Sequence, residues 1–226
     1  MPDAFQSLLS AILEDDRGKV KGLLHNDPAI AQRSVAREVH ESRIAHWIYS
    51  GDTALHVAAA GYRVEIAKTL LAAGADPAAA RNRRVSQPLH YAADGYLENP
   101  AWDPGRQVQM IRLLLDAGAN VNAQDKNGAT PLHRAVRTRC AAAVKCLLDA
   151  SADPKIRNKP GSTAFHLAVQ NTGRGGSGSD KAREAQREII EAFLKREAST
   201  KLKDAKGKSV LDWAKGDWIR KMLAGK

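Results

Sequence analysis

Seven histidines are the first residues to weigh in this sequence, because an imidazole can act as a general base or bind a metal ion. Four of them, His56, His90, His133 and His166, close the tetrapeptides Thr-Ala-Leu-His, Gln-Pro-Leu-His, Thr-Pro-Leu-His and Thr-Ala-Phe-His. An active site needs different groups that converge on one pocket. Equal positions in a repeating pattern instead place the imidazoles in a row, so the repetition predicts a structural role.

The other three histidines, His25, His40 and His46, complete no metal-binding motif. His40-Glu41 is followed by Ile44 where a zinc-binding helix would carry its second histidine. A zinc site needs three or four converging ligands. A site formed by His40, His46 and a distant carboxylate therefore stays open as a minor alternative.

Other catalytic signatures are absent from the sequence. Residues 173–179 are rich in glycine but lack the Gly-Lys-Ser/Thr ending of a phosphate-binding loop, which favours a flexible connector. No nucleophile elbow or kinase motif occurs. We therefore expect no enzyme, no catalytic residue, no cofactor and no metal site.

The elements that position these residues recur along the chain. Each histidine tetrapeptide is followed by x-Ala-(Ala/Val), and a weaker copy begins at Ser209. A second marker follows downstream, in Leu70–Asp76, Leu114–Asn120 and Leu147–Asp153. With both markers in the same order, the chain resembles the ankyrin repeat family between about residues 5 and 223. Its long loops and Ala/Arg-rich composition are similar to those of bacterial members.

The resemblance implies an all-α fold: a solenoid of stacked helix–turn–helix units joined by β-hairpin-like finger turns. It also implies that the four repeated imidazoles tie neighbouring turns together through backbone hydrogen bonds. The residue types agree, because Thr can cap a helix and Gly74 and Gly118 stand where a helix must stop. Ser151 and Glu197 replace that glycine in the later repeats. In the first repeat, Gly61 comes one position before the family's usual glycine, and Tyr62 takes the place of that glycine.

We expect one domain over residues 1–226. The predicted boundaries are a degenerate N-terminal capping repeat and linker at 1–50, repeats at 51–82, 83–125, 126–158 and 159–204, and a C-terminal cap at 205–226. Spacing between the markers predicts inserted loops at 96–105 and 172–184, where Pro100 and Pro104 oppose helix continuation in the first. Proteolysis is expected first near residues 173–180.

Composition narrows the functional classes. The chain has 226 residues, 43% hydrophobic and 27% charged, enough to bury a core, and its two cysteines make no disulfide scaffold. No apolar run is long enough to span a membrane. We expect a cytoplasmic monomer with no membrane partner. The net charge of +10 points to acidic partners.

Ankyrin-like proteins usually bind through finger tips and the exposed side of the first helix, which line a concave face. Carried over by register, the predicted partner-binding residues are Arg83, Arg84, Tyr91, Lys126, Asn127, Arg134, Arg137, Lys159, Lys206 and Lys208. Because most are cationic, we expect a non-catalytic module that binds an acidic protein partner, with Tyr91 as an aromatic anchor. Simple solvation of exposed charge is the competing interpretation.

Two further functions stay open. Nucleic acid or another polyanion would suit the same basic face, although no recognition helix or RNA-binding motif supports it. An immunity or inhibitor protein that blocks a partner enzyme would use a repeat surface equally well. No residue separates that role from a general adaptor.

Overall fold

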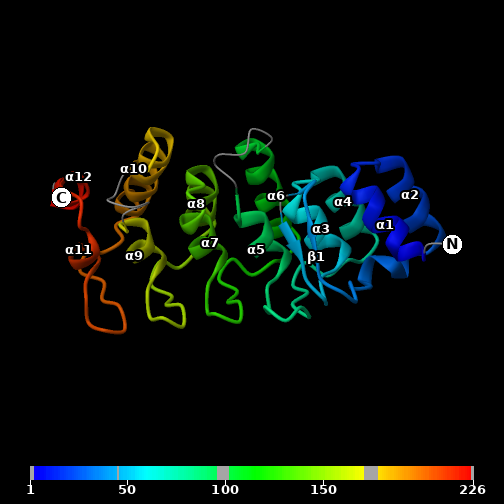
Figure 1. Cartoon of the computed structure of the whole chain (residues 1–226), viewed down its shortest axis with the longest axis horizontal. Helices are drawn as coiled ribbons and strands as arrows, with labels where there is room; N and C mark the ends of the chain where they lie inside the picture. The colour runs from blue at the N-terminus through cyan, green and yellow to red at the C-terminus, as the bar shows by residue number, and fades with distance from the viewer. Residues whose placement is uncertain (1–2, 45, 96–101, 171–177, 225–226) are drawn as a thin grey trace.

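A computed structural model of the chain describes residues 3–44, 46–95, 102–170 and 178–224. The molecule is an elongated stack of helix pairs with the termini at opposite ends and loops that descend from one edge (Figure 1). The helices are α1 (Ala4–Leu13), α2 (Arg17–Asn26), the short 3₁₀ helix η1 (Pro28–Gln32), α3 (Ala54–Ala60), α4 (Val64–Ala72), α5 (Pro88–Ala93), α6 (Pro104–Asp116), α7 (Pro131–Arg137), α8 (Ala141–Asp149), α9 (Ala164–Ala168), α10 (Asp180–Lys195), α11 (Val210–Trp213) and α12 (Asp217–Ala224).

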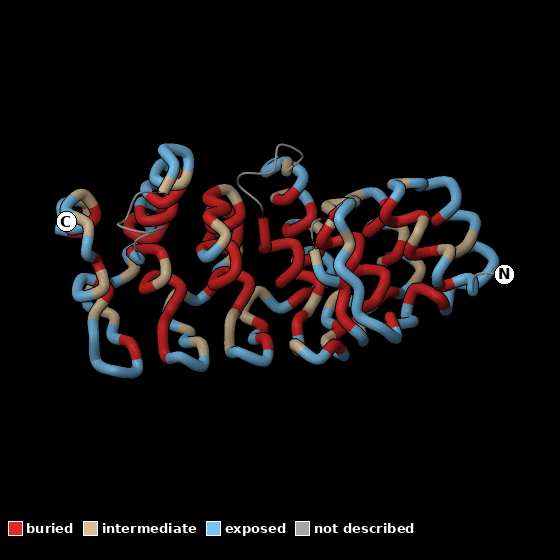
Figure 2. The backbone as a smooth tube through the Cα atoms, viewed as in Figure 1, coloured by how far each residue is buried: buried red, intermediate tan, exposed pale blue. Residues whose placement is uncertain are grey.

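The helices form two rows. One row runs α1, α3, α5, α7, α9, α11, and the other runs α2, α4, α6, α8, α10, with each helix packed on the next. The core lies between the rows, where the small residues of the first helices allow close approach (Figure 2). Because each unit packs mainly on its neighbours, stability is spread along the stack.

The repeated histidines are structural, as the sequence predicts. In α7, Thr130 Oγ1 accepts the N–H of His133, while His133 Nδ1 accepts the N–H of Thr130 at 3.2 Å. The Nε2 atom of His133 lies 3.2 Å from the carbonyl oxygen of Ser162 in the next finger, so it carries the proton. Burial lowers the pKa of His133, which keeps the ring neutral and suited to both bonds.

The second helices end in left-handed residues whether or not glycine is present. Gly74 and Gly118 have φ of 88° and 91°, and Ser151 and Glu197 take the same conformation at 65° and 55°. Tyr62, at the end of the first helix α3, has φ of 52°. A side chain in this region costs about 1–2 kcal/mol relative to glycine, so these ends are strained and the fold is retained.

A small β-sheet corrects the all-α expectation. Strands β1 (Val39–Glu41) and β2 (His46–Ile48) pair antiparallel, with Val39 opposite Ile48, inside the segment expected to be a linker. In β2, Ile48 is buried and Trp47 is 50% exposed, so the hairpin lays one side on the stack and shows the other to solvent.

The predicted insertions need a correction at their ends. Pro104 and Gly105 belong to the first turn of α6, because Asp103 caps the helix and proline is accepted at its first position. Likewise α10 begins at Asp180, behind the capping Ser179. Residues 96–101 and 171–177, which include most of the predicted protease-sensitive segment, lie outside the described residues.

Buried glutamines join the helices on either side of both insertions. Gln107 in α6 donates to the carbonyl of Ala92 at 3.0 Å, and Gln186 in α10 donates to the carbonyl of Ala168 at 2.7 Å. In α7–α8, which has no insertion, the N–H of Cys140 instead donates to the carbonyl of Ala135. A side chain thus replaces the turn's backbone bond where the chain is interrupted.

Neither a membrane span nor a metal cluster occurs in the parts of the chain described. None of the helices there is long and apolar enough to cross a bilayer. Over the same residues, no three His, Cys, Asp or Glu side chains come close enough to hold a metal ion, so His40 and His46 form no such group.

Candidate interaction groove

Seven of the ten predicted binding positions line three hollows that share residues: Arg84, Asn127, Arg134, Arg137, Lys159, Lys206 and Lys208. The first, of about 220 Å³, includes Arg84, Arg134 and Arg137 in its lining. The second, of about 760 Å³, shares Arg134 and Arg137 with it. The third, of about 480 Å³, shares Gln170 with the second. Together they form one continuous surface, here called the groove, from the β2 strand to α11.

Fingers and first helices build the walls of the groove. Neighbouring fingers are tied by backbone bonds: the N–H of Lys126 donates to the carbonyl of Arg84 at 2.7 Å, and that of Lys159 donates to Asn127 at 2.8 Å. These bonds hold the finger backbones in a fixed row. The groove is therefore formed before any partner arrives, which reduces the entropy cost of binding.

One finger tip is strained. The turns of the other fingers carry Gly51, Gly128, Gly161 and Gly207, all with positive φ. The corresponding residue between Arg84 and Ser86 is Val85, with φ of 52° and 45% exposure. A β-branched residue is rare in this conformation. The strain lies beside the first hollow.

A buried ion network crosses the groove floor. Arg134 is only 3% exposed, and its guanidinium lies 2.9 Å from Asp94 and 2.8 Å from Asp125. It also donates to the hydroxyl of Ser86 at 2.6 Å. Arg137, with its side chain 57% exposed, reaches the other oxygen of Asp94 at 3.2 Å.

The network sets the charge of its members. Burial alone would raise the pKa of Asp94, but Arg134, together with His46 and Arg137, holds that pKa well below its usual range. Burial and the positive charge of Arg134 lower the pKa of His90 to about 4. Asp94 is thus an anion and His90 is neutral at pH 7, and the charges on the floor largely cancel.

Tyr91 and Arg134 correct the predicted site. Both are almost fully buried, at 2% and 3% exposure, so neither presents its side chain to a partner. The Tyr91 hydroxyl donates to the Asp52 carboxylate at 2.9 Å. Burial, with Asp52 beside it, raises the pKa of Tyr91. Both side chains connect repeats instead of forming an open surface.

The other predicted residues reach the protein surface, either in the groove or, for Arg83 and Lys126, in the fingers beside it. Arg84 is half-buried and donates to the Tyr49 hydroxyl at 2.7 Å. Arg83 is paired with Glu38 at 2.8 Å. The remaining predicted positions are exposed: Lys126, Asn127, Arg137, Lys159, Lys206 and Lys208.

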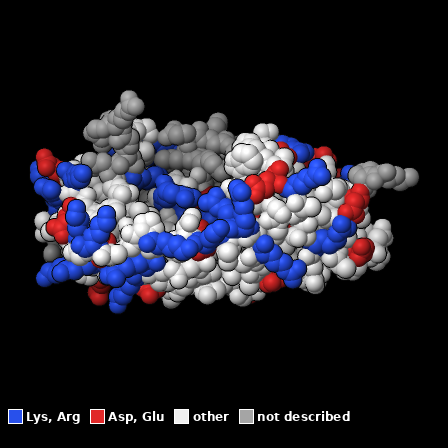
Figure 3. All heavy atoms as spheres, turned by 60° about the horizontal axis from the view of Figure 1, so that its bottom comes forward, with Lys and Arg blue, Asp and Glu red and all other residues white. Residues whose placement is uncertain are grey.

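The free positive charge lies toward the C-terminal end. Among the described residues, Lys126, Lys159, Lys206, Lys208 and Lys215 have no carboxylate within 4.0 Å. Figure 3 shows Lys and Arg gathered over the middle and C-terminal parts of this face. Unpaired exposed cations raise the local concentration of anions, which gives the groove a charge preference.

Sequence reasoning missed several groove residues. His46 and Trp47 line the first hollow from the β2 strand, and Arg139 and Leu167 line the second. The β2 residues had no repeat position to mark them. Leu167 did have such a signal, because it directly follows a repeated histidine as Tyr91 and Arg134 do.

Comparison with known proteins agrees with this architecture. A model of the ankyrin repeat matches residues 50–83, and a model of three ankyrin repeats matches residues 101–177. The E3 ubiquitin-protein ligase KEG of Arabidopsis thaliana is 36% identical over 72 residues, 32% of this chain and 4% of that protein. The Ankyrin repeat and LEM domain-containing protein 1 homolog of Caenorhabditis elegans is 42% identical over 59 residues, 26% of this chain and 7% of that protein.

The likeness to these large proteins is confined to a small part of each. The stress-activated protein kinase alpha of Dictyostelium discoideum is 36% identical over 56 residues, 25% of this chain and 8% of that protein. The matched segment thus spans less than a tenth of each of these three relatives. Shared repeat models, the capped first helices and the hydrogen-bonded fingers lead to one conclusion: the chain belongs to the ankyrin repeat family.

Proposed function

We propose that this protein is a non-catalytic binding module whose groove holds an acidic segment of a protein partner. Ankyrin repeats generally mediate protein–protein interactions. The observation that carries the finer proposal is a set of exposed lysines with no carboxylate within 4.0 Å among the described residues. Lys159, Lys206, Lys208 and Lys215 line the groove, and Lys126 lies in a finger beside it. Opposite charge on the partner would speed encounter and select against basic proteins.

The shape of the groove favours a peptide segment as the occupant. Its fingers, which backbone bonds tie to one another, present cations in a row, and the predicted aromatic anchor Tyr91 is buried. Its floor charges are neutralised within the protein by Asp94 and Asp125. An extended chain with carboxylates at intervals fits these features.

A fluorescent oligoglutamate peptide tests the proposal. We expect it to bind in fluorescence anisotropy, with affinity falling as salt rises from about 0.05 M to about 0.3 M. The triple variant Lys159→Glu, Lys206→Glu, Lys208→Glu should weaken binding by about tenfold or more, since three attractive pairs become repulsive.

A matched variant separates the groove from overall charge. The control variant makes the same change in net charge elsewhere, with Lys19→Glu and Lys21→Glu in α2 and Lys195→Glu in α10. These lysines are exposed and line none of the three hollows. This control should bind like the parent. Equal loss in both triple variants, or tighter binding of an oligothymidylate than of oligoglutamate, would contradict the proposal.

A further inference from the structure

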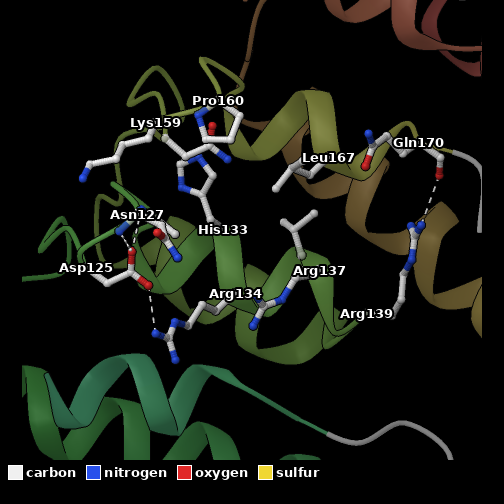
Figure 4. Close-up of a pocket in the computed structure, with 13 residues that line it drawn as sticks. Asp125, Asn127, His133, Arg134, Arg137, Arg139, Lys159, Pro160, Leu167 and Gln170 are labelled. Atoms are coloured by element: carbon white, nitrogen blue, oxygen red, sulfur yellow. Dashed lines mark hydrogen bonds and ion pairs between the residues drawn. The ribbon is translucent and has the colours of Figure 1, made fainter. Parts of the chain in front are cut away.

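The largest hollow of the groove has a cationic rim and a partly apolar interior. It lies between the fingers at 125–129 and 158–160, over α7 and the end of α9, as Figure 4 shows. Apolar side chains from both repeats line it: Ala129, Val136, Pro160 and Leu167. At about 760 Å³ the space is large enough to enclose a large side chain.

Leu167 explains why the groove opens here. The residue that follows the repeated histidine position lines the groove as Arg134 in α7 and, after Asp212 in place of histidine, as Trp213 in α11. In α9 the same position holds the shorter Leu167, which is half-buried. The smaller side chain leaves volume that the larger ones fill in neighbouring repeats.

The polar groups around this interior are largely satisfied within the protein. His133 bonds to Thr130 and Ser162, as described above. Arg139, 9% exposed, donates to the carbonyls of Ala168 and Gln170 at 3.4 and 3.1 Å. Arg134 is paired with carboxylates and leaves only its Nε without a partner. A polar side chain entering this space would lose water and gain few bonds in return.

The rim of the hollow, unlike its interior, is exposed and cationic. Arg137 keeps 57% of its side chain exposed, and Lys159 is exposed without a carboxylate within 4.0 Å among the described residues. They rise from different elements, α7 and the following finger (Figure 4). Carboxylates placed on either side of the hollow would meet these cations without being buried.

We propose that this hollow is an anchor site for one large apolar side chain of the partner, flanked by acidic residues that contact the rim. The inference rests on the proposed acidic partner and specifies its sequence pattern: acidic, apolar, acidic. Interface energy concentrates in such enclosed anchors, while surrounding charges give selectivity.

Two peptides test the anchor. The first is the oligoglutamate probe. The second is the same peptide with its central glutamate replaced by leucine, which removes one charge and adds one apolar side chain. We expect the leucine peptide to bind about tenfold more tightly, because burial of a leucine side chain outweighs one exposed charge pair. A leucine in an oligoserine frame should bind far more weakly than either.

Variants locate the gain in the hollow. The ratio of the two dissociation constants should fall from about ten to below three in Leu167→Asn, which makes the floor polar. It should fall likewise in Leu167→Trp, which occupies part of the hollow with a larger side chain, the residue type that α11 has at this position in Trp213. Leu211→Asn is the control, because Leu211 is 46% exposed and lines none of the three hollows.

Each outcome has a distinct meaning. Oligoglutamate binding without any gain from leucine would overturn the anchor and leave the proposed function standing. A gain that persists in both Leu167 variants would also overturn it. Failure of every acidic peptide to bind would overturn the anchor and the acidic partner together. Circular dichroism melting curves check that both Leu167 variants are folded.

Discussion

The two ends of the groove hold similar numbers of cations and use them differently. Toward the β2 strand, Arg134 and Arg137 are bound to Asp94, and Arg134 also to Asp125. Toward α11, Lys206 and Lys208 have no such partners among the described residues. Position in a repeat therefore does not determine whether a cation holds the fold together or faces a partner.

Depth is the physical reason for this difference. A guanidinium that is 3% exposed must be paired, because an isolated buried charge is costly. An exposed lysine remains hydrated and needs no counter-charge. Substitutions at the N-terminal end of the groove are therefore predicted to change stability, and substitutions at the C-terminal end to change partner binding.

The largest expected effect comes from breaking the buried network. Arg134→Leu leaves Asp94 and Asp125 buried without their shared cation, and should lower the free energy of unfolding by about 3–5 kcal/mol. Urea denaturation followed by circular dichroism measures this loss. Lys159→Leu, the matched change at an exposed cation, should alter stability by less than about 0.5 kcal/mol. Equal losses in the two variants would remove the contrast between the ends.

A smaller effect is expected from Asp94→Asn, which removes the charge of this side chain and keeps its shape. Its pKa is held below the ordinary value, so its ionised form stabilises the fold above about pH 4 and that contribution is lost as the pH falls through the lowered pKa. Asp94→Asn should cost about 2 kcal/mol at pH 7 and progressively less in acid.

Urea denaturation at a series of pH values measures the dependence on Asp94. The parent should lose stability between about pH 4 and pH 2 more steeply than Asp94→Asn. Asp180→Asn is the control, since Asp180 is 95% exposed at the start of α10. Parallel pH curves for the parent and Asp94→Asn would show that the network does not depend on this carboxylate.

How much of the structure can be predicted from the sequence depends on how far apart along the chain the interacting residues lie. The role of the repeated histidines in helix capping and the helix end at Gly74 follow from local chemistry, and the structure confirms both. The β1–β2 hairpin was missed because three-residue strands show no reliable alternation. Ser151 adopts the left-handed conformation without glycine, and the helix end keeps its backbone bond from the N–H of Ala152 to the carbonyl of Leu147.

The site was harder to predict than the fold for a similar reason. Register predicts Lys159 and Lys206 as partner-binding residues, and both line the groove in the structure. It misplaced Tyr91 and Arg134, whose burial depends on Asp52 and Asp94 in other elements. Sequence position shows which face a residue belongs to, whereas a partner distant along the chain decides whether its side chain is free.

The smallest effect concerns the finger tip at the paired end of the groove. Val85 has φ of 52° where Gly161 and Gly207 occupy the corresponding turns at the unpaired end. Val85→Gly should raise the free energy of unfolding by about 1 kcal/mol, because release of a strained β-branched backbone exceeds the entropy that glycine adds to the unfolded chain.

Val39→Gly provides the matched control for this prediction. Val39 has nearly the same exposure as Val85, 49% against 45%, but it lies in the extended strand β1, where valine is favoured. Its replacement should therefore lower stability while Val85→Gly raises it, in the same thermal or urea unfolding experiment. If both substitutions destabilise the protein, the Val85 turn is not strained. In that case the two ends of the groove differ in their ion pairs but not in the backbone strain of their fingers.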